Sequence, residues 1–276
     1  MTDTILFAFI GLLGGFFGAM VGLGGGVFII PGLTLFMGVP IHSAVAAGLI
    51  SVVATSTTAA ASYVREGLSN IRLGITLETM TVLGALAGGL VGTSLGKEAL
   101  SGIFGGIMIM VAVYMLFSGR ATSAIGTECS DLGEFGASYY DRNQQKEVSY
   151  RPKRLWVGLL TSLIAGIVSG LLGVGGGFLN VPVLILVLGV PVRAATTTSS
   201  FMLGATACAG SLVYLTKGLI DPTVAVPVVL GVIVGAYLGS KLAVKVRSTV
   251  LIAILAVVLF ALSVQMILAA AGVSIR

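Results

Sequence analysis

The sequence predicts an all-α polytopic membrane protein made of two homologous, inverted repeats, each with a broken helix at a glycine-rich segment. Composition indicates the membrane class: 57% of the 276 residues are apolar and 9% are charged, whereas about a quarter of the residues in an ordinary soluble domain are charged. A phrase that occurs twice indicates the repeats and the breaks. It reads GLGGGVFIIPGLTLFMGVP at residues 22–40 and GVGGGFLNVPVLILVLGVP at residues 173–191.

Apolar segments along nearly the whole chain are expected to be helices. A helix of about 20 residues spans the hydrocarbon core and satisfies its own backbone hydrogen bonds. Residues 1–4 lack the basic start of a cleavable signal peptide, so the first segment is expected to be retained. In chain order the segments are 5–22, 26–37, 43–64, 73–95 and 99–118, then 155–174, 178–189, 194–216, 223–245 and 249–273.

The repeat extends well beyond the glycine phrase. Residues 18–89 align with residues 169–240 without a gap, and glycines, prolines and a tyrosine recur in register. Because both halves are rich in small apolar residues, a few of these matches are expected by chance, but the whole set of matched glycines and prolines is not. The sequence therefore predicts a first transmembrane repeat at 1–118, a polar linker or small extramembrane element at 119–154, and a second transmembrane repeat at 155–276.

The short segments 26–37 and 178–189 decide how the halves face. About 18 Å of helix is too short to span a membrane alone. If these segments cross as part of a broken helix, each half has an odd number of passes and the halves are inverted. If they re-enter, the halves are parallel. The inverted arrangement puts more Lys and Arg on the side of the linker, so the charge bias favours inversion with a cytoplasmic linker.

Each glycine triplet is a candidate binding site for a small anion. Glycine allows an irregular backbone and exposes N–H groups beside a helix end, where a compact oxyanion is stabilised. Close helix packing is the alternative explanation. The prolines that follow, Pro31 and Pro182, favour a functional break. The glycines are Gly24, Gly25 and Gly26 in the first half and Gly175, Gly176 and Gly177 in the second.

Hydroxyl side chains after each triplet are further substrate-binding candidates. They offer neutral donors to an anion, although each one can instead bond to a helix carbonyl. Asn180 adds an amide in the second half, where the first half has Ile29, so an asymmetric site is expected. The hydroxyl candidates are Ser51 and Thr55 in the first half and Thr196, Thr197, Thr198, Ser199 and Ser200 in the second.

Three ionisable residues are candidates for contact with the substrate or a coupling ion: Glu78, His42 and Arg193. Of these, Glu78 or His42 could carry a proton. Ionisable residues inside a membrane are functional suspects, but all three are expected near segment ends, where they can also reach lipid headgroups. No metal site, cofactor or enzymatic centre is expected, because paired acids, HExxH and the Lys-Ser/Thr of a phosphate loop are absent. The net charge of +5 fits loops that face anionic lipid and needs no nucleic acid.

The stretch SGLLGVGGGFLNVPVLILVLGVPVRAATTTSSFMLGATACAGSLVYLTKGLIDP at residues 169–222, with the first-half phrase and the linker leading into YRPKRL, resembles the TauE/SafE family of membrane permeases. The resemblance implies secondary transport of sulfite or another small sulfur-containing anion, or an organosulfonate, across the cytoplasmic membrane. Family members often have Lys where Asn180 stands and Asn where Ser200 stands. An anion channel of the same architecture and a non-transporting membrane scaffold are the alternatives, and the oligomeric state is left open.

Overall fold

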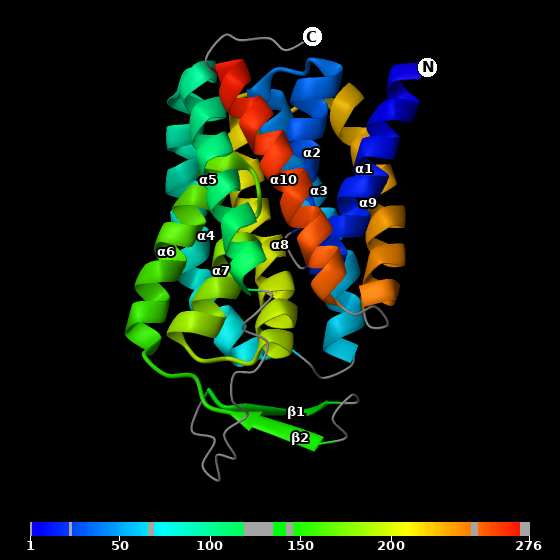
Figure 1. Cartoon of the computed structure of the whole chain (residues 1–276). Helices are drawn as coiled ribbons and strands as arrows, with labels where there is room; N and C mark the ends of the chain where they lie inside the picture. The colour runs from blue at the N-terminus through cyan, green and yellow to red at the C-terminus, as the bar shows by residue number, and fades with distance from the viewer. Residues whose placement is uncertain are drawn as a thin grey trace.

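A computed structural model describes residues 2–21, 24–65, 69–118, 135–141, 146–243 and 248–270. The chain forms a bundle of long helices with a small β-hairpin at one end (Figure 1). The first half contains α1 (Thr2–Val21), α2 (Gly26–Pro31), the π-helical turn η1 (Gly32–Phe36), α3 (Ile41–Arg65), α4 (Ile71–Ser94) and α5 (Lys97–Ser118). The second half contains α6 (Leu155–Leu172), α7 (Gly177–Pro182), η2 (Val183–Val187), α8 (Val192–Thr216), α9 (Pro222–Ala243) and α10 (Ser248–Ala270).

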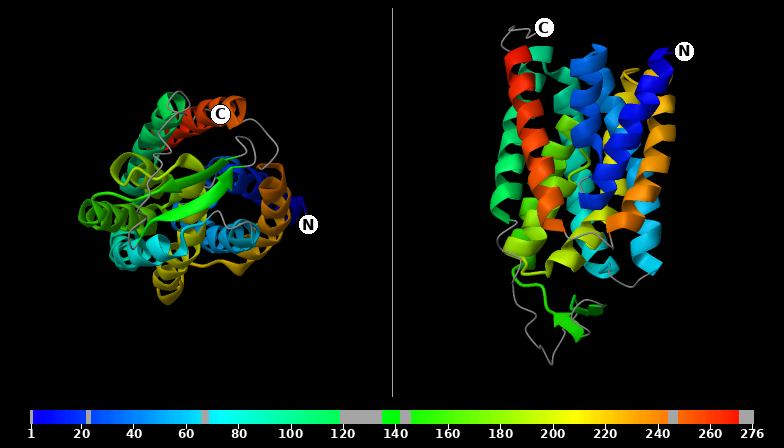
Figure 2. Two further views of the ribbon diagram at one scale, coloured as in Figure 1. Left: turned by 90° about the horizontal axis from the view of Figure 1, so that it is seen from below. Right: turned by 45° about the vertical axis from the view of Figure 1, so that its right-hand side comes forward.

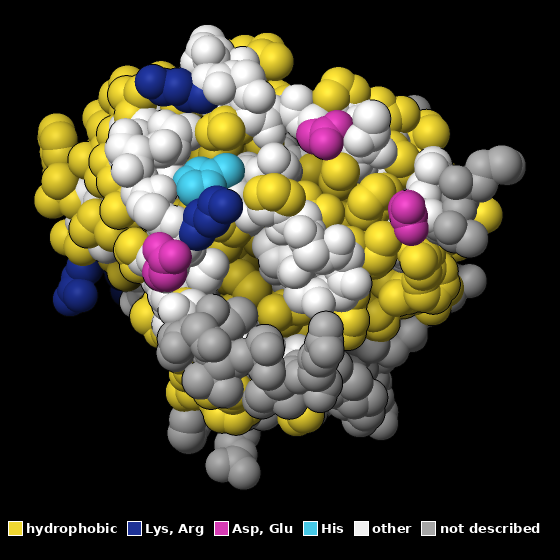
Figure 3. Space-filling model, turned by 90° about the horizontal axis from the view of Figure 1, so that it is seen from above, with side chains coloured by type: hydrophobic (Ala, Val, Ile, Leu, Met, Phe, Trp, Pro, Cys, Tyr) yellow, Lys and Arg dark blue, Asp and Glu magenta, His cyan; other side chains and the backbone are white. Residues whose placement is uncertain are grey.

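The predicted all-α membrane architecture is confirmed. Among the described residues, six helices are long and apolar enough to cross a membrane: α1, α3, α4, α6, α8 and α9. Large hydrophobic side chains on their outer faces are exposed, including Ile5, Leu160 and Trp156. Viewed from the end where α1 begins, the molecule shows only scattered charged side chains among hydrophobic and uncharged ones (Figure 3). The exposed hydrophobic side chains on the outer helix faces fit a lipid surrounding.

The helix breaks occur where the glycine phrases predict them. Helix α1 ends at Val21 and α2 begins at Gly26, while α6 ends at Leu172 and α7 begins at Gly177. Each short helix then widens into a π-helical turn directly after its proline, Pro31 or Pro182. Proline has no backbone N–H, so it cannot make the helix hydrogen bond at its own position.

Each short segment runs back beside the helix that precedes it. A Cβ added at Gly25 would lie 2.8 Å from the carbonyl oxygen of Gly14, and one added at Gly32 would lie 2.9 Å from Ile10 Cγ2. In the second half, Gly176 lies beside Ser169 and Gly158 beside Leu188. The chain therefore turns back at each break and leaves on the side from which it came. The expectation that re-entry makes the halves parallel is wrong, because α1 and α6 end at breaks that lie inside the bundle, so each of these helices and its short segment form a returning pair that adds no net crossing.

The two halves run in opposite directions through the bundle. Helix α1 begins and α10 ends at one end of the molecule, and the β-hairpin between the halves lies at the other (Figure 1). Across the halves, α1 packs against α9, α6 against α4, α5 against α10 and α3 against α8. Glycines allow several of these close approaches, since a Cβ at Gly84 would lie 2.2 Å from the Leu163 carbonyl oxygen.

The linker contributes a structure that the sequence predicted only as a small extramembrane element. Strands β1 (Ala137–Asp141) and β2 (Lys146–Tyr150) pair antiparallel and lie across the end of the bundle (Figure 2). Asn70 connects them to the helices: its side chain accepts from the Leu73 N–H as the N-cap of α4 and donates to the Phe135 carbonyl. Burial of Tyr150 raises its pKa to about 12. The hairpin is therefore docked on the bundle.

Candidate functional site

The two glycine breaks meet in the middle of the bundle. Gly24 and Gly175 have φ angles of +81° and +82°, which side chains rarely adopt. A Cβ at Gly24 would lie 2.9 Å from Val52 Cγ1, and one at Gly175 would lie 2.3 Å from the same atom. Both positions also lie within 3.4 Å of a Leu203 methyl group. Val52 on α3 and Leu203 on α8 thus pack between the two breaks.

The breaks also touch each other directly. A Cβ at Gly26 would lie 2.8 Å from the carbonyl oxygen of Gly173 and 3.2 Å from Val174 Cα. Gly48 on α3 approaches the same Gly173 carbonyl, at 3.2 Å. The glycine phrases, far apart in the sequence, therefore form one contact region. A side chain at Gly26 would therefore displace the second break.

The second break contains buried polar side chains without partners. Asn180 and Ser169 are 1% and 0% exposed, and neither the Asn180 amide atoms nor Ser169 Oγ has a hydrogen-bond partner within the described part of the chain. A Cβ at Gly176 would lie 3.4 Å from Ser169 Oγ and 3.7 Å from Asn180 Nδ2. An unpaired buried polar group costs about 1–3 kcal/mol. Two such groups beside one glycine indicate a place prepared for a polar ligand or water.

The first break is apolar at the equivalent place. Ile29 is fully buried, and a Cβ at Gly14 would lie 2.4 Å from Ile29 Cγ1. Ser51 and Thr55 on α3 are buried, but their hydroxyls donate to the carbonyls of Ala47 and Ser51. Of the two, Thr55 lies near the break, with its Oγ1 3.5 Å from a Cβ placed on Gly25. Of the two breaks, the second therefore has the buried polar groups without described partners.

The hydroxyl run of α8 does not converge on one point. Thr196, Thr197 and Ser200 donate to carbonyls of their own helix, those of Val192, Ala194 and Thr196. Thr198 accepts from the Asn70 N–H, at the hairpin end of the bundle. Ser199 alone of this run reaches the break, where its Oγ donates to the Gly177 carbonyl at 3.4 Å.

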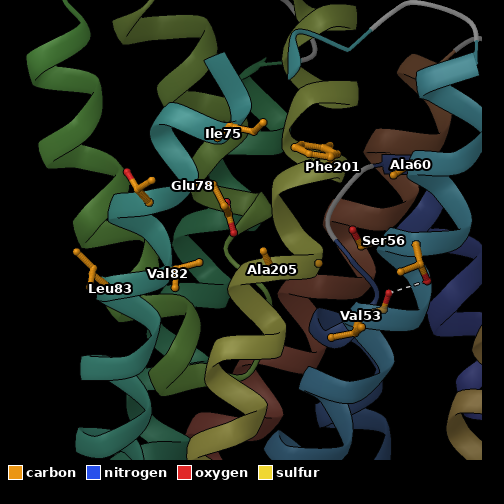
Figure 4. A pocket seen from close by; sticks show the side chains of 12 residues that line it. Val53, Ser56, Ala60, Ile75, Glu78, Val82, Leu83, Phe201 and Ala205 are labelled. Carbon is orange, nitrogen blue, oxygen red and sulfur yellow. Dashed lines mark hydrogen bonds between the residues drawn. The ribbon is translucent and has the colours of Figure 1, made fainter. Parts of the chain in front are cut away.

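A groove of about 790 Å³ lies between α3, α4 and α8. Its walls are mostly apolar. Phe201 and Ala205 of α8 lie between Glu78 of α4 and Ser56 of α3 (Figure 4). The sequence did not indicate this groove, because one of its three helices, α8, is distant along the chain from α3 and α4. Its polar side chains are Ser56, Thr57, Glu78 and Thr79.

Glu78 is buried where α4 packs against α8. It is the eighth residue of α4, about two turns from the start of the helix, and its side chain is 8% exposed. Glu78 Oε1 accepts a hydrogen bond from Thr206 Oγ1 at 2.6 Å, in the middle of α8. Glu78 Oε2 is buried and has no partner among the residues described.

The other two ionisable candidates lie at helix ends. His42 Nε2 is 3.1 Å from the carbonyl oxygen of Leu95, directly after α4. Arg193 is the second residue of α8, and its side chain lies outside the described residues. Within the described ranges, no group of three His, Cys, Asp or Glu side chains could hold a metal ion.

Two residues of this region were missed by the sequence argument, Ser169 and Thr206. Ser169 had a detectable signal, since it is a hydroxyl directly before the second glycine phrase, where the aligned position of the first half is Gly18. Thr206 aligns with the candidate Thr55 in the repeat, but threonine is ordinary in a membrane helix, and only the structure places it opposite Glu78.

Comparison with known proteins identifies the family. The model of the sulfite exporter TauE/SafE family matches residues 7–266. The probable membrane transporter protein YunE of Bacillus subtilis is 24% identical over 95% of this chain and 97% of its own. YdhB of the same organism and a protein of Xylella fastidiosa, both also named probable membrane transporter proteins, are 25% and 28% identical over 80% of this chain and 81% and 77% of theirs.

No solved structure matches the chain. The family match covers nearly all of the sequence. The chain therefore belongs to the sulfite exporter TauE/SafE family and is a multi-pass membrane transporter.

Proposed function

We propose that this TauE/SafE family member is a secondary transporter that moves a small sulfur-containing anion by alternating access. Sulfite is the first candidate, and another sulfur oxyanion or an organosulfonate is the next. The observation that supports this proposal most strongly is the pair of unpartnered side chains, Asn180 and Ser169, beside Gly176 where the two breaks meet.

The chemistry of this pair suits a compact oxyanion. The Asn180 Nδ2 group and the Ser169 hydroxyl are neutral donors, so they can bond to anionic oxygens without the cost of burying a cation. The Asn180 Oδ1 atom adds an acceptor for a water or for a protonated oxyanion. Close packing by Gly176 and by the opposite break favours a small ligand over a large one. We therefore place the substrate between Asn180, Ser169 and the backbone of residues 175–177.

The arrangement of the halves supports alternating access. We propose that the halves are inverted repeats, because they run in opposite directions. Their contacts also match: α1 of the first half packs against α9 of the second, and α6 of the second half packs against α4 of the first. Inverted repeats that meet at broken helices are a known transporter plan. Asn180 and Ser169 are closed off from solvent here, so a substrate can reach them only after the halves move. The charge bias supports a cytoplasmic linker side.

Uptake of radiolabelled sulfite into proteoliposomes tests the substrate. We expect saturable uptake that unlabelled sulfite competes away and that falls roughly 10-fold or more in Asn180→Leu, because a hydrogen bond to a charged group contributes about 1.5–3 kcal/mol. Competition by sulfoacetate or sulfate in place of sulfite would retain the site and change the substrate. No flux of any tested anion, from protein that elutes as a folded species, would contradict the proposal and favour a scaffold.

A further inference from the structure

Glu78 is the one titratable side chain among the residues that line the groove between α3, α4 and α8. The two oxygens of its carboxyl group lie in different environments. Oε1 accepts from Thr206 on α8, while Oε2 is buried without a partner in the described part of the chain. A carboxylate that is buried with one oxygen unsatisfied is unfavourable, whereas a neutral carboxyl group or one reached by water is not.

The helices around Glu78 provide no described cation to pair with it. Helix α6 contains no charged residue, and α8 contains Arg193, Cys208 and Tyr214. Of these, the Arg193 side chain is outside the described residues, Cys208 is exposed and the Tyr214 hydroxyl donates to the Leu171 carbonyl. Arg72 is exposed at the first turn of α4, before Glu78.

The remaining wall of the groove is α3. Its titratable residues are His42, Tyr63 and Arg65. The His42 ring bonds to Leu95 at the far end of α4, and the side chains of Tyr63 and Arg65 lie outside the described residues. In the described structure, the charge on Glu78 therefore depends on proton exchange through the groove and not on a neighbouring ion.

Helix α8 connects this carboxyl group to the proposed anion site. Within two turns it contains Ser199, which bonds to the second break, Leu203, which packs against both breaks, and Thr206, which bonds to Glu78. A change of charge on Glu78 therefore acts on the helix that lines the substrate region.

We propose that Glu78 is the proton-binding site that couples anion movement to the proton gradient. This inference rests on the proposed transport function and adds its coupling ion. A proton from water in the groove binds to Oε2, the free oxygen, and Oε1 keeps its bond from Thr206. The neutral carboxyl group then tolerates closure of the groove, and the proton returns to water when the group is hydrated again after the halves have moved.

Two transport measurements on the same vesicles separate coupling from substrate movement. Labelled sulfite is followed first as exchange at equal pH on both sides and then as accumulation driven by an imposed pH gradient. In Glu78→Gln we expect exchange within about threefold of wild type and no gradient-driven accumulation; in Glu98→Gln, an exposed glutamate at the start of α5, we expect both to persist. Accumulation by Glu78→Gln under the pH gradient would overturn the proposal, and so would accumulation by wild type that requires a sodium gradient.

Infrared spectroscopy tests the proton site without any substrate. The carbonyl stretch of a protonated carboxyl group is distinct from the bands of a carboxylate. At neutral pH we expect this band in wild type and Glu98→Gln, its loss in Glu78→Gln, and a frequency shift in Thr206→Val, where the donor to Oε1 is missing. Absence of this band from wild type at every pH at which the protein transports would refute proton binding, even if sulfite proves not to be the substrate. Absence of sulfite flux with the expected infrared band would contradict only the proposed substrate.

Discussion

Replacing Asn180 with leucine is expected to make the protein more stable and to weaken anion transport strongly. Asn180 is 1% exposed and neither its Nδ2 nor its Oδ1 atom has a partner among the described residues. Leucine has nearly the same shape and no polar atoms, and the aligned residue of the first half is the fully buried Ile29. The substitution therefore removes an unsatisfied group without opening a cavity.

The magnitude follows from the cost of that unsatisfied group. Burying an unpaired polar group costs about 1–3 kcal/mol, so Asn180→Leu is expected to raise the free energy of unfolding by up to that amount. For a chain of 150–250 residues, each kcal/mol corresponds to about 2–4 °C in Tm. Loss of a hydrogen bond to an anion, about 1.5–3 kcal/mol, is expected to lower substrate affinity roughly 10- to 150-fold.

Thermal unfolding of detergent-purified protein and initial rates of sulfite uptake measure the two effects on the same preparation. Ser162→Ala is the matched control, because Ser162 is also a buried hydroxyl without a described partner, on α6 and about 10 Å along the helix from Ser169. This control is expected to keep Tm at or above that of wild type and to transport normally. Uptake at the wild-type rate by Asn180→Leu would refute the assignment of the site, and a lower Tm would refute the unpaired state of the amide.

Three further predictions concern the contact between the two breaks and the docking of the hairpin. Gly26→Ala is expected to slow uptake, since its Cβ would lie 2.8 Å from the Gly173 carbonyl oxygen, whereas Gly106→Ala, with no described atom within 4 Å, should leave uptake unchanged. Asn70→Ala is expected to destabilise the docked hairpin by about 1–3 kcal/mol, because it leaves buried groups unpaired. Faster hydrogen exchange in β1 and β2 would show this loss, and unchanged exchange would contradict the docking. Burial raises the pKa of Tyr150 from 10.0 to about 12, so the stabilisation from this raised pKa is complete below pH 10 and declines as pH rises through 12. Tyrosinate absorbance that is lost in Tyr150→Phe reports its ionisation, and ionisation near pH 10 would contradict this prediction.

The helices and their breaks could be predicted because their signals are local. Apolar runs of spanning length set the extents of α3, α4 and α8, and glycine followed by proline marks where a helix cannot continue. The return of α2–η1 alongside α1 was not predictable in the same way. It depends on close contacts between Gly25 and Gly14 and between Gly32 and Ile10, which belong to separate segments.

The candidate site was predicted in part. The glycines and Asn180 were identified, because irregular backbone and a single amide stand out in an apolar sequence. The run Thr196–Ser200 looked like a polar cluster, but most of its hydroxyls bond to their own helix, which satisfies them locally in an apolar surrounding. The burial of Glu78 and its bond to Thr206 arise from the packing of α4 on α8, which no single segment encodes.

Sulfite counterflow in proteoliposomes tests alternating access around the two breaks most directly. Vesicles loaded with unlabelled sulfite are diluted into a trace of labelled sulfite, and internal label is followed with time. A site that faces one side at a time returns with label bound after each release, so the purified protein is expected to accumulate label transiently above the external concentration, and Asn180→Leu is expected to show no such excess. Label that rises only to equality, at a rate that does not saturate, would contradict alternating access and identify an open anion pathway.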